Sequence, residues 1–169
     1  AVINGETETG VTTMIINEKM DQGPILLQEK TEIGPDETAG DIHDRLAEIG
    51  SRLIINTLEK IENDEIEPQE QPEKGTYAPK LTKKDGRIDW SKTAKEVHDK
   101  IRGMTPWPRS FTFYEGRKVL IFKSKYHGKK SFLPKGAAPG QIIGFTNSGI
   151  TVLCGENSLL ELKELQPAS

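Results

Sequence analysis

A proline-rich segment near the middle of the chain sets the strongest limit on what it can fold into. Residues 64–79 contain, among glutamates and glutamines, Pro68, Pro72, Pro79 and Gly75. Proline cannot continue a helix or donate to a sheet, so this composition is typical of a stiff linker. The sequence therefore predicts two folded parts, residues 1–64 and 81–169, joined by a linker over residues 65–80.

Charge divides the chain at nearly the same place. Residues 1–70 carry 5 Lys and Arg against 17 Asp and Glu, a balance of −12. Residues 71–169 carry 18 against 9, a balance of +9, and most of the excess lies within residues 71–135, with 17 against 6. A basic region of this kind is typical of proteins that bind a polyanionic partner. From charge alone, an ordinary solvated protein surface explains it equally well.

The first part has the pattern of two strands and one helix. Residues 11–16 and 25–30 are rich in β-branched and aliphatic side chains and are separated by a polar loop, which predicts two strands. Thr38 is placed to cap a helix, with Asp41 in the capping-box position, and the helix is expected to end near Asn63. One stripe at helical spacing predicts its buried face: Ile42, Leu46, Ile49, Leu53, Leu58 and Ile61.

The second part has the pattern of a short helix followed by strands. Ser91 or Thr93 is placed to cap the helix, and Glu96 completes a capping box for Thr93. Strands are predicted over residues 110–114, 117–123, 141–145, 149–153 and 159–165. Five short strands with glycine-marked turns and a basic surface indicate a small barrel of the oligonucleotide-binding (OB) kind. A plain β-sandwich fits nearly as well.

Few residues outside the loops suggest chemistry. Cys154 cannot form an internal disulfide and is expected to be a buried apolar residue on a strand. His43, His98 and His127 lie in separate segments without a motif, so we expect solvated surface positions and no metal site. No apolar run is long enough to cross a bilayer, and no secretion signal opens the sequence. The chain begins at Ala1 without a methionine, so we expect a fragment or a processed piece.

Five motifs in order along the chain carry a family resemblance. They are Gly-Glu-Thr-Glu-Thr-Gly-Val-Thr-Thr-Met at residues 5–14, Met-Asp-Gln-Gly-Pro-Ile-Leu at 20–26, Thr-Tyr-Ala-Pro-Lys-Leu-Thr-Lys-Lys at 76–84, Arg-Ile-Asp-Trp at 87–90 and Ile-Arg-Gly-Met-Thr-Pro-Trp-Pro at 101–108. The first motif is similar to several folate-dependent formyltransferases. Together the motifs resemble the methionyl-tRNA formyltransferase family over nearly the whole chain.

The resemblance implies a fold and a partial active site for the first part. Residues 1–64 would form the C-terminal part of a Rossmann-like catalytic domain that uses 10-formyltetrahydrofolate and no metal. Asp21 matches the family's catalytic aspartate, and Met20, Gln22 and Gly23 would line the folate pocket. The family's asparagine, histidine and Ser-Leu-Leu-Pro motif lie upstream and are absent from this sequence, so we expect the fragment alone to be inactive.

For the second part, the resemblance implies an OB-like domain that binds initiator methionyl-tRNA. We select the candidate contacts by charge and position: Lys80, Lys83, Lys84, Arg87, Arg102, Lys118, Lys123 and Lys125. Contacts of basic side chains with phosphates give affinity and salt dependence but little base readout. Trp107 could stack on RNA, but we expect it to pack the helix against the barrel, and we expect the same of Trp90.

Three functional hypotheses follow. The first is transfer of a formyl group to methionyl-initiator tRNA for translation initiation, by a cytoplasmic monomer. The second is a sugar-nucleotide formyltransferase, which shares the Glu-Thr-Gly-Val-Thr and Pro-Trp-Pro features. The third is a stand-alone RNA-binding barrel. The lysines that follow the linker favour tRNA over a small sugar nucleotide, and the strand–loop–strand around Asp21 argues against a pure binding module.

Overall fold

The chain forms two compact units in the computed structural model, which describes residues 1–72, 75–129, 134 and 136–168. One unit contains residues 8–33 and 41–80; the other contains residues 1–7, 34–40 and 81–169. The elements are η1 (Val2–Asn4), β1 (Glu8–Met14), β2 (Ile25–Glu32), α1 (Ala39–Glu62), η2 (Lys83–Gly86), α2 (Ala94–Gly103), β3 (Ser110–Tyr114), β4 (Arg117–Lys129), β5 (Ile142–Thr146), β6 (Gly149–Leu153) and β7 (Ser158–Pro167).

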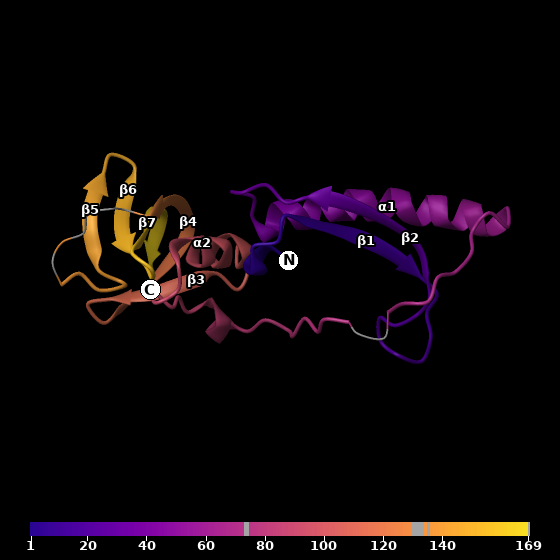
Figure 1. Ribbon diagram of the computed structural model, residues 1–169, viewed down its shortest axis with the longest axis horizontal. Coiled ribbons are helices and arrows are strands. Elements are labelled where there is room, and N and C mark those ends of the chain that lie inside the picture. The colour runs from indigo at the N-terminus through magenta and orange to yellow at the C-terminus, as the bar shows by residue number, and fades with distance from the viewer. Residues whose placement is uncertain (73–74, 130–133, 135, 169) are drawn as a thin grey trace. The chain divides into compact units, whose positions relative to one another are not determined.

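The smaller unit is an antiparallel hairpin with a long helix beside it. β1 pairs with β2 from Glu8 opposite Glu32 to Met14 opposite Ile25, and α1 runs alongside the two strands (Figure 1). Hydroxyl groups join the layers, since Thr13 Oγ1 lies 2.9 Å from Thr57 Oγ1. The amide of Leu27 also donates to Thr13 Oγ1. Thr57, one of the most deeply buried residues of α1, is thus held by a polar contact where the sequence pattern predicts only apolar packing.

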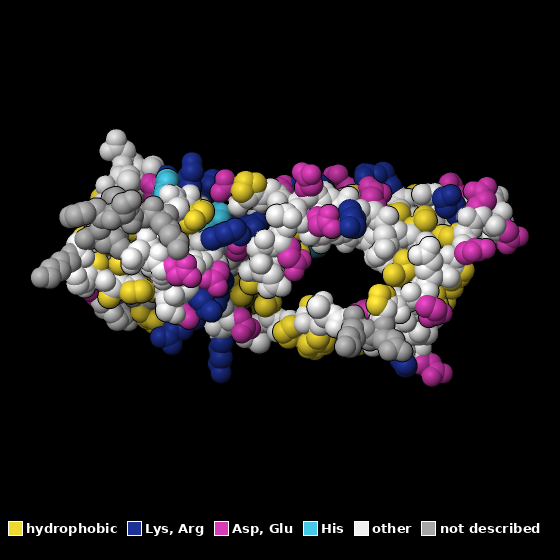
Figure 2. Space-filling view, in the orientation of Figure 1, with side chains coloured by type: hydrophobic (Ala, Val, Ile, Leu, Met, Phe, Trp, Pro, Cys, Tyr) yellow, Lys and Arg dark blue, Asp and Glu magenta, His cyan; other side chains and the backbone are white. Residues whose placement is uncertain are grey.

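Helix α1 starts directly after Thr38 and ends at Glu62, as predicted, but only part of its apolar stripe is buried. Ile42, Ile49 and Leu53 are buried, whereas Leu58 and Ile61 are exposed, so their predicted burial is wrong. The neighbouring apolar residues Ile54 and Ile55 are exposed as well. Figure 2 shows hydrophobic side chains at the surface of this unit. The C-terminal half of α1 therefore presents apolar side chains that this unit does not cover.

The larger unit is built on a five-stranded antiparallel sheet with the strand order β3-β4-β7-β6-β5 (Figure 1). The long strand β4 pairs with β3 on one side and with β7 on the other. Three register shifts occur along the β4–β7 pair, which bends these strands. In the described residues, β3 and β5 are the edges of the sheet and do not pair with each other, so no closed barrel is found.

Helix α2 covers one face of this sheet. Its capping box is present as predicted: Thr93 accepts from the amide of Glu96, and the Glu96 carboxylate accepts from the amide and hydroxyl of Thr93. Hydrogen bonds from the Thr93 hydroxyl and amide hold the pKa of Glu96 below its usual value. The core between helix and sheet is formed by Ile88, Ala94, Val97, Ile101, Ile121, Val152, Cys154, Leu160 and Leu162.

Two polar residues of α2 are buried against residues 34–40, which belong to the same unit. The ring of His98 lies 2.9 Å from Ser124 Oγ through Nδ1 and 3.0 Å from the Pro35 carbonyl oxygen through Nε2. His98 is only 6% exposed, so its predicted surface position is wrong. The reason is that residues 34–37, more than sixty positions earlier in the sequence, cover this face of the helix.

Arg102 is buried on the same face, and its guanidinium group is fully engaged. It forms an ion pair with Asp99 at 2.8 Å and donates to the carbonyl oxygens of Gly34 and Glu37. Lys95 approaches the other carboxylate oxygen of Asp99 at 2.8 Å. With 5% of its surface exposed, Arg102 cannot reach a phosphate, and the prediction that it contacts RNA is corrected.

For most of the remaining strands, the bounds predicted from the sequence lie close to the observed bounds. The predicted and observed bounds agree for β3 and β6, and differ by one or two residues at the end of β2 and at both ends of β5 and β7. β1 begins three residues before its predicted start and ends two before its predicted end, whereas β4 extends to Lys129, six residues beyond the prediction. The predicted linker includes residues 73 and 74, which lie outside the described residues. Among the described residues, no helix has the length and apolar character of a membrane span.

Candidate functional site

The loop that carries Asp21 connects β1 to β2 at one end of the hairpin. The loop is closed at its base by the amide of Ile15, which donates to the Pro24 carbonyl oxygen at 2.9 Å. Inside the loop, the side chain of Asn17 donates to the carbonyl oxygen of Gln22. Asp21 has φ 55°, a left-handed conformation that Asp and Asn adopt more readily than other side chains. The carboxylate is exposed at the surface of the unit.

Gln71, which the sequence did not single out, fixes the position of this loop. Its side-chain amide donates to the carbonyl oxygens of Asp21 at 3.0 Å and Gly23 at 2.7 Å. Gln69 forms paired backbone hydrogen bonds with Ile25, at the first residue of β2. The segment after α1 therefore returns to the hairpin as a third partner. Its glutamines are typical of a linker, so the pattern gave no signal of this role.

Gly23 is required by the close packing of the loop backbone. It is buried, and a Cβ at this position would overlap the Ile15 carbonyl oxygen. Met20, on the other side of Asp21, is 87% exposed, and Gln22 is exposed too. The loop thus presents one carboxylate flanked by an apolar and an amide side chain on a backbone held by Gln71.

This arrangement can accept a proton or a hydrogen bond at Asp21, and Glu18 and Lys19 are the other ionisable side chains of the loop. None of the three histidines lies in the loop. Within the described ranges, no group of three His, Cys, Asp or Glu side chains could hold a metal ion. Gln71 fixes the backbone at Asp21, and the loop supplies carboxylates and one ammonium group but no imidazole or thiol.

The basic residues that follow the linker lie around the short helix η2. Lys80, Lys83, Lys84 and Arg87 are all exposed. η2 has its own capping box, in which Asp85 accepts from the amide of Thr82 at 2.6 Å and from its hydroxyl at 2.7 Å. These hydrogen bonds hold the pKa of Asp85 below its usual value. Asp85 is thus an ordered carboxylate, and the neighbouring lysines extend into solvent.

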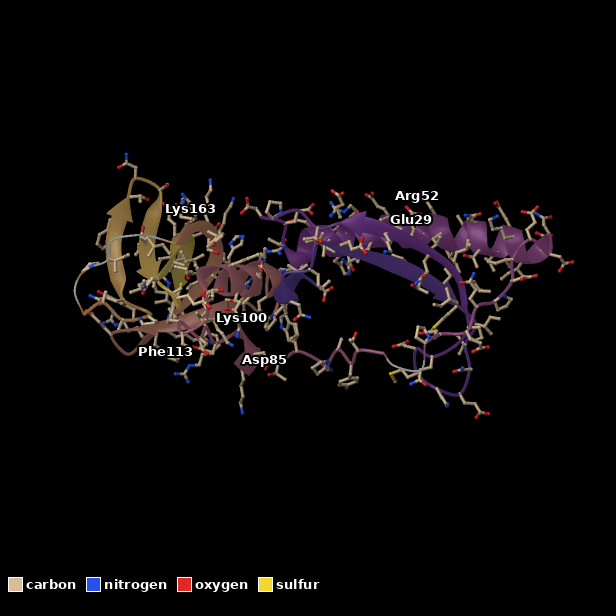
Figure 3. The ribbon with its side chains drawn as sticks, viewed as in Figure 1. Glu29, Arg52, Asp85, Lys100, Phe113 and Lys163 are labelled. Carbon is tan, nitrogen blue, oxygen red and sulfur yellow. The ribbon has the colours of Figure 1, made fainter. Side chains whose placement is uncertain are left out.

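Lys100, a basic residue of α2 that was not selected from the sequence, has a different environment. It is half-buried, and this burial lowers the pKa of its ammonium group despite the opposing attraction of Asp85 and Asp89. Figure 3 shows Lys100 and Asp85 in this part of the unit. Lys100 thus lies within electrostatic range of two exposed carboxylates of the same unit, Asp85 and Asp89.

The other predicted RNA contacts lie on β4. Lys123 and Lys125 are exposed, and Lys118 is partly buried with its Nζ 4.0 Å from the ring centroid of Phe111. These residues share a strand, but they lie on a different element from the lysines of η2. The described residues therefore present the selected cations as two groups, one at residues 80–87 and one along β4.

The two tryptophans differ in a way that the sequence did not reveal. Trp90 packs against the core and donates from Nε1 to Thr112 Oγ1 at 3.0 Å, as expected for a packing residue. Trp107 is 54% exposed, so its predicted role in packing the helix is wrong. It lies between two cis peptide bonds, Thr105–Pro106 and Trp107–Pro108. In this turn its side chain extends away from the core.

A second polar cluster surrounds Glu161 on β7. Its carboxylate accepts hydrogen bonds from Lys163 at 2.8 Å, Ser148 at 2.9 Å and the Thr146 hydroxyl, and lies 2.8 Å from His127 Nε2. The hydrogen bond from Lys163, which Figure 3 labels, is the largest of the contributions that hold the pKa of Glu161 far below its usual value. The cluster joins β4, β7 and the β5–β6 turn. Both carboxylate oxygens of Glu161 accept hydrogen bonds within it.

Cys154 is buried directly after β6, close to its predicted place on a strand. Burial raises the pKa of its thiol to about 12. A thiol with such a pKa is a poor nucleophile near neutral pH, because the reactive form is the thiolate. Cys154 is therefore a packing residue of the core.

Comparison with known proteins identifies relatives of both parts. Residues 80–169 match the formyl transferase C-terminal domain family, and residues 1–58 match the formyl transferase family. The methionyl-tRNA formyltransferase of Alkaliphilus oremlandii is 46% identical over 167 residues, which cover 98% of this chain and 52% of that protein. That of Heliobacterium modesticaldum is 42% identical over 173 residues, covering 99% and 54%. The chain thus spans about half the length of these relatives.

Solved structures with the same fold include an N-formyltransferase from Helicobacter canadensis, in complex with folinic acid and dTDP-3-aminofucose. The TM-score is 0.75, the identity 20%, and the match covers 96% of this chain and 58% of that one. HypX from Aquifex aeolicus in complex with tetrahydrofolic acid gives a TM-score of 0.68 at 20% identity, covering 99% and 29%. At this identity the likeness concerns the fold alone.

Proposed function

Since the chain belongs to the formyl transferase family, we propose that it takes part in transferring a formyl group from 10-formyltetrahydrofolate to the α-amine of initiator methionyl-tRNA, for translation initiation. The observation that carries the proposal is the identity of 42% and 46% to two methionyl-tRNA formyltransferases over nearly the whole chain. The sugar formyltransferase fold match has 20% identity, so it gives weaker support to a sugar-nucleotide substrate.

Asp21 is the proposed catalytic residue of this chain. In the reaction, the neutral amine attacks the formyl carbon, a new carbon–nitrogen bond forms, and the bond to the folate nitrogen breaks. The attacking nitrogen must lose a proton, and the departing folate nitrogen must gain one. An exposed carboxylate on a fixed loop can accept that proton through a water or stabilise a neighbouring imidazolium. A positioned general base contributes about 10²–10⁴ to the rate.

Met20, Gln22 and Gly23 are the proposed folate contacts. The absence of a side chain at Gly23 lets the loop backbone fold closely, and Met20 offers an exposed apolar surface for a flat ring. Gln22 offers an exposed amide that can donate and accept hydrogen bonds. A folate carries both an aromatic ring system and hydrogen-bonding groups, and these three residues have matching properties.

The proposed tRNA contacts are Lys80, Lys83, Lys84 and Arg87, together with Lys118, Lys123 and Lys125. Six of the seven are exposed, and Arg102 is omitted because it is buried. We assign all of them except Lys80 to an OB-like domain over residues 81–169. Lys80 is the last residue of the linker over residues 65–80, and residues 1–64 form part of a Rossmann-like catalytic domain. We further propose a monomer that acts in the cytoplasm.

Titration of the 169-residue chain with initiator tRNA at about 50 and about 200 mM salt tests this function. Several phosphate contacts would lower the affinity by about 10² or more across that range. Replacing Lys83 and Lys84 with Gln should reduce the slope of log K against log salt by about 1 for each lysine. A matched control replaces Lys19 and Lys60 of the acidic unit, and this pair should leave the slope unchanged.

Absence of tRNA binding at low salt by the folded chain would contradict the proposal. Binding of a UDP-sugar in the same assay, without tRNA binding, would support the sugar-nucleotide alternative. Equal effects of the two double-lysine variants would mean that Lys83 and Lys84 are not phosphate contacts, even if tRNA binds.

A further inference from the structure

One face of the β3–β4 ribbon carries phenylalanine rings, each with a cation over it. The Cζ of Arg87 lies 5.9 Å from the ring centroid of Phe113, and the Cζ of Arg109 lies 5.2 Å from that of Phe122. The third pair is Lys118 and Phe111, at 4.0 Å. We call these six residues the ring–cation face. These six residues belong neither to the apolar core nor to the Asp21 loop, so neither accounts for their arrangement.

The strand register places these side chains on the face opposite to the core. Ser110 pairs with Ile121, both are fully buried, and Ile121 belongs to the core beneath α2. Because side chains alternate along a strand, Phe111 and Phe113 lie on the other face, as do their partners Leu120 and Lys118. The rings of Phe111 and Phe113 meet edge to face, with centroids 5.9 Å apart.

The face is accessible and basic. Phe113, labelled in Figure 3, is 53% exposed although it is a large apolar side chain. Arg87 and Arg109 are exposed as well. Lys118, the partner of Phe113, adds a third cation to this face, whereas Arg117 alternates to the other face. Glu115 is the single acid between Arg109 and Lys123. On the neighbouring β7, Glu164 pairs with Lys123 and adds a second acid at the border.

We propose that the ring–cation face binds unpaired nucleotides of the RNA partner. The inference rests on the proposed function, and it adds a type of contact that phosphate-binding lysines do not provide. Aromatic side chains stack on single bases, and interleaved cations bind the phosphates between them. The bases of a duplex are already stacked on each other, so an aromatic ring on a protein surface can stack only on the unpaired bases of single-stranded ends and loops.

The chemistry of the face favours RNA over a protein partner. Protein contact surfaces bury apolar residues at their centre and are depleted in charge there. Here every ring is covered by a charged group, which would have to be desolvated in a protein contact. With a nucleotide, the same cation can stay beside the ring and contact a phosphate, while the base takes the exposed side of the ring.

Fluorescence anisotropy with two labelled RNAs tests the proposal: a uridine oligomer of about twelve nucleotides, which is unstructured, and a blunt-ended RNA duplex of similar length, which has no unpaired nucleotides. The variant is Phe113→Leu, which retains an apolar side chain but cannot stack. Loss of one base–aromatic stack should weaken oligomer binding at least about 5-fold. Affinity for the duplex should change less than about 2-fold.

Phe145→Leu is the matched control. Phe145 is 77% exposed on β5, at the opposite end of the strand order, and no cation–ring pair of the described residues includes it. This variant should leave both RNA affinities unchanged. In addition, Phe113→Trp should show fluorescence quenching on binding the oligomer, which reports stacking directly and does not depend on a destabilised fold.

Three outcomes would overturn the inference. Equal effects of Phe113→Leu and Phe145→Leu would remove the distinction between the two surfaces. Salt-dependent tRNA binding without any binding of the oligomer would leave the proposed function intact and exclude the ring–cation face. Self-association of the chain that Phe113→Leu abolishes, with unchanged RNA affinity, would assign the face to a protein contact. Failure of the wild-type chain to bind any RNA would contradict the proposed function itself.

Discussion

At the scale of single residues, the proposed catalytic role of Asp21 can be tested separately from the stability of its loop. Within the part of the chain that the structure describes, no hydrogen bond to the Asp21 side chain is found, whereas its backbone carbonyl oxygen accepts from Gln71. Its left-handed backbone suits both Asp and Asn. Asp21→Asn should therefore change the free energy of unfolding of this chain by less than about 0.5 kcal/mol.

The same substitution should have a large effect on chemistry. When the chain is joined to the N-terminal half of a methionyl-tRNA formyltransferase, Asp21→Asn should lower kcat for formyl transfer about 10²- to 10⁴-fold. Affinity for initiator tRNA should remain the same. A loss of kcat below about 3-fold, in a variant of unchanged stability, would mean that Asp21 is not the catalytic base.

Residue roles that depend on distant segments were the ones that sequence reasoning missed. Arg102 and His98 have the charge and spacing of a helix surface, but residues 34–37 bury them. Trp107 has the large aromatic side chain that is typical of a core residue, yet it is exposed. The segment that buries Arg102 and His98 lies far away in the sequence, and Trp107 lies in a turn. Neither situation produces a pattern in the sequence around the residue.

At the scale of elements, the Glu161 cluster links stability to pH. The pKa of Glu161 is lowered in the folded state, so its contribution to stability is present above its unfolded pKa, near 4.5. It is lost as the pH falls below that value toward the lower folded pKa. Glu161→Gln should lower the free energy of unfolding at pH 7, and its difference from wild type should shrink progressively in acid. Urea unfolding at several pH values measures this.

The exposed Glu164 on the same strand provides the comparison for that experiment. Glu164→Gln should change the free energy of unfolding by less than about 0.5 kcal/mol at pH 7. A difference between Glu161→Gln and wild type that stays constant from pH 7 to strongly acidic conditions would show that packing, and not the charge of Glu161, is responsible.

Elements with strong local signals were the ones that the sequence predicted well. The cap at Thr93 has Glu96 at the right distance, and both sides of the box form. The strands that are flanked by glycine turns were located to within a few residues. The long extension of β4 had no such signal, because pairing with β7 continues through several register shifts. Its length is set by that partner strand.

At the scale of the whole chain, the two units should differ in stability. The larger unit has a nine-residue apolar core beneath α2, whereas the smaller one buries four aliphatic side chains, Ile33, Ile42, Ile49 and Leu53. Each buried aliphatic side chain stabilises a fold by about 1.5–3 kcal/mol. Hydrogen exchange should therefore give the amides of β1 and β2 an opening free energy at least about 3 kcal/mol below that of β4 and β7. Equal protection would show that the chain unfolds as one cooperative unit.

The path of the chain between the units limits how this protein can be divided. Residues 34–40 belong to the same unit as residues 81–169, although the sequence on either side of them belongs to the other unit. A shortened chain that starts at Leu81 would lack the carbonyl oxygens that Arg102 and His98 bind, and would expose both side chains. The C-terminal part is therefore not an interchangeable module. Gene fusions or recombination events that exchange it would have to carry the 34–40 segment along, so the two stretches of sequence are expected to be inherited together.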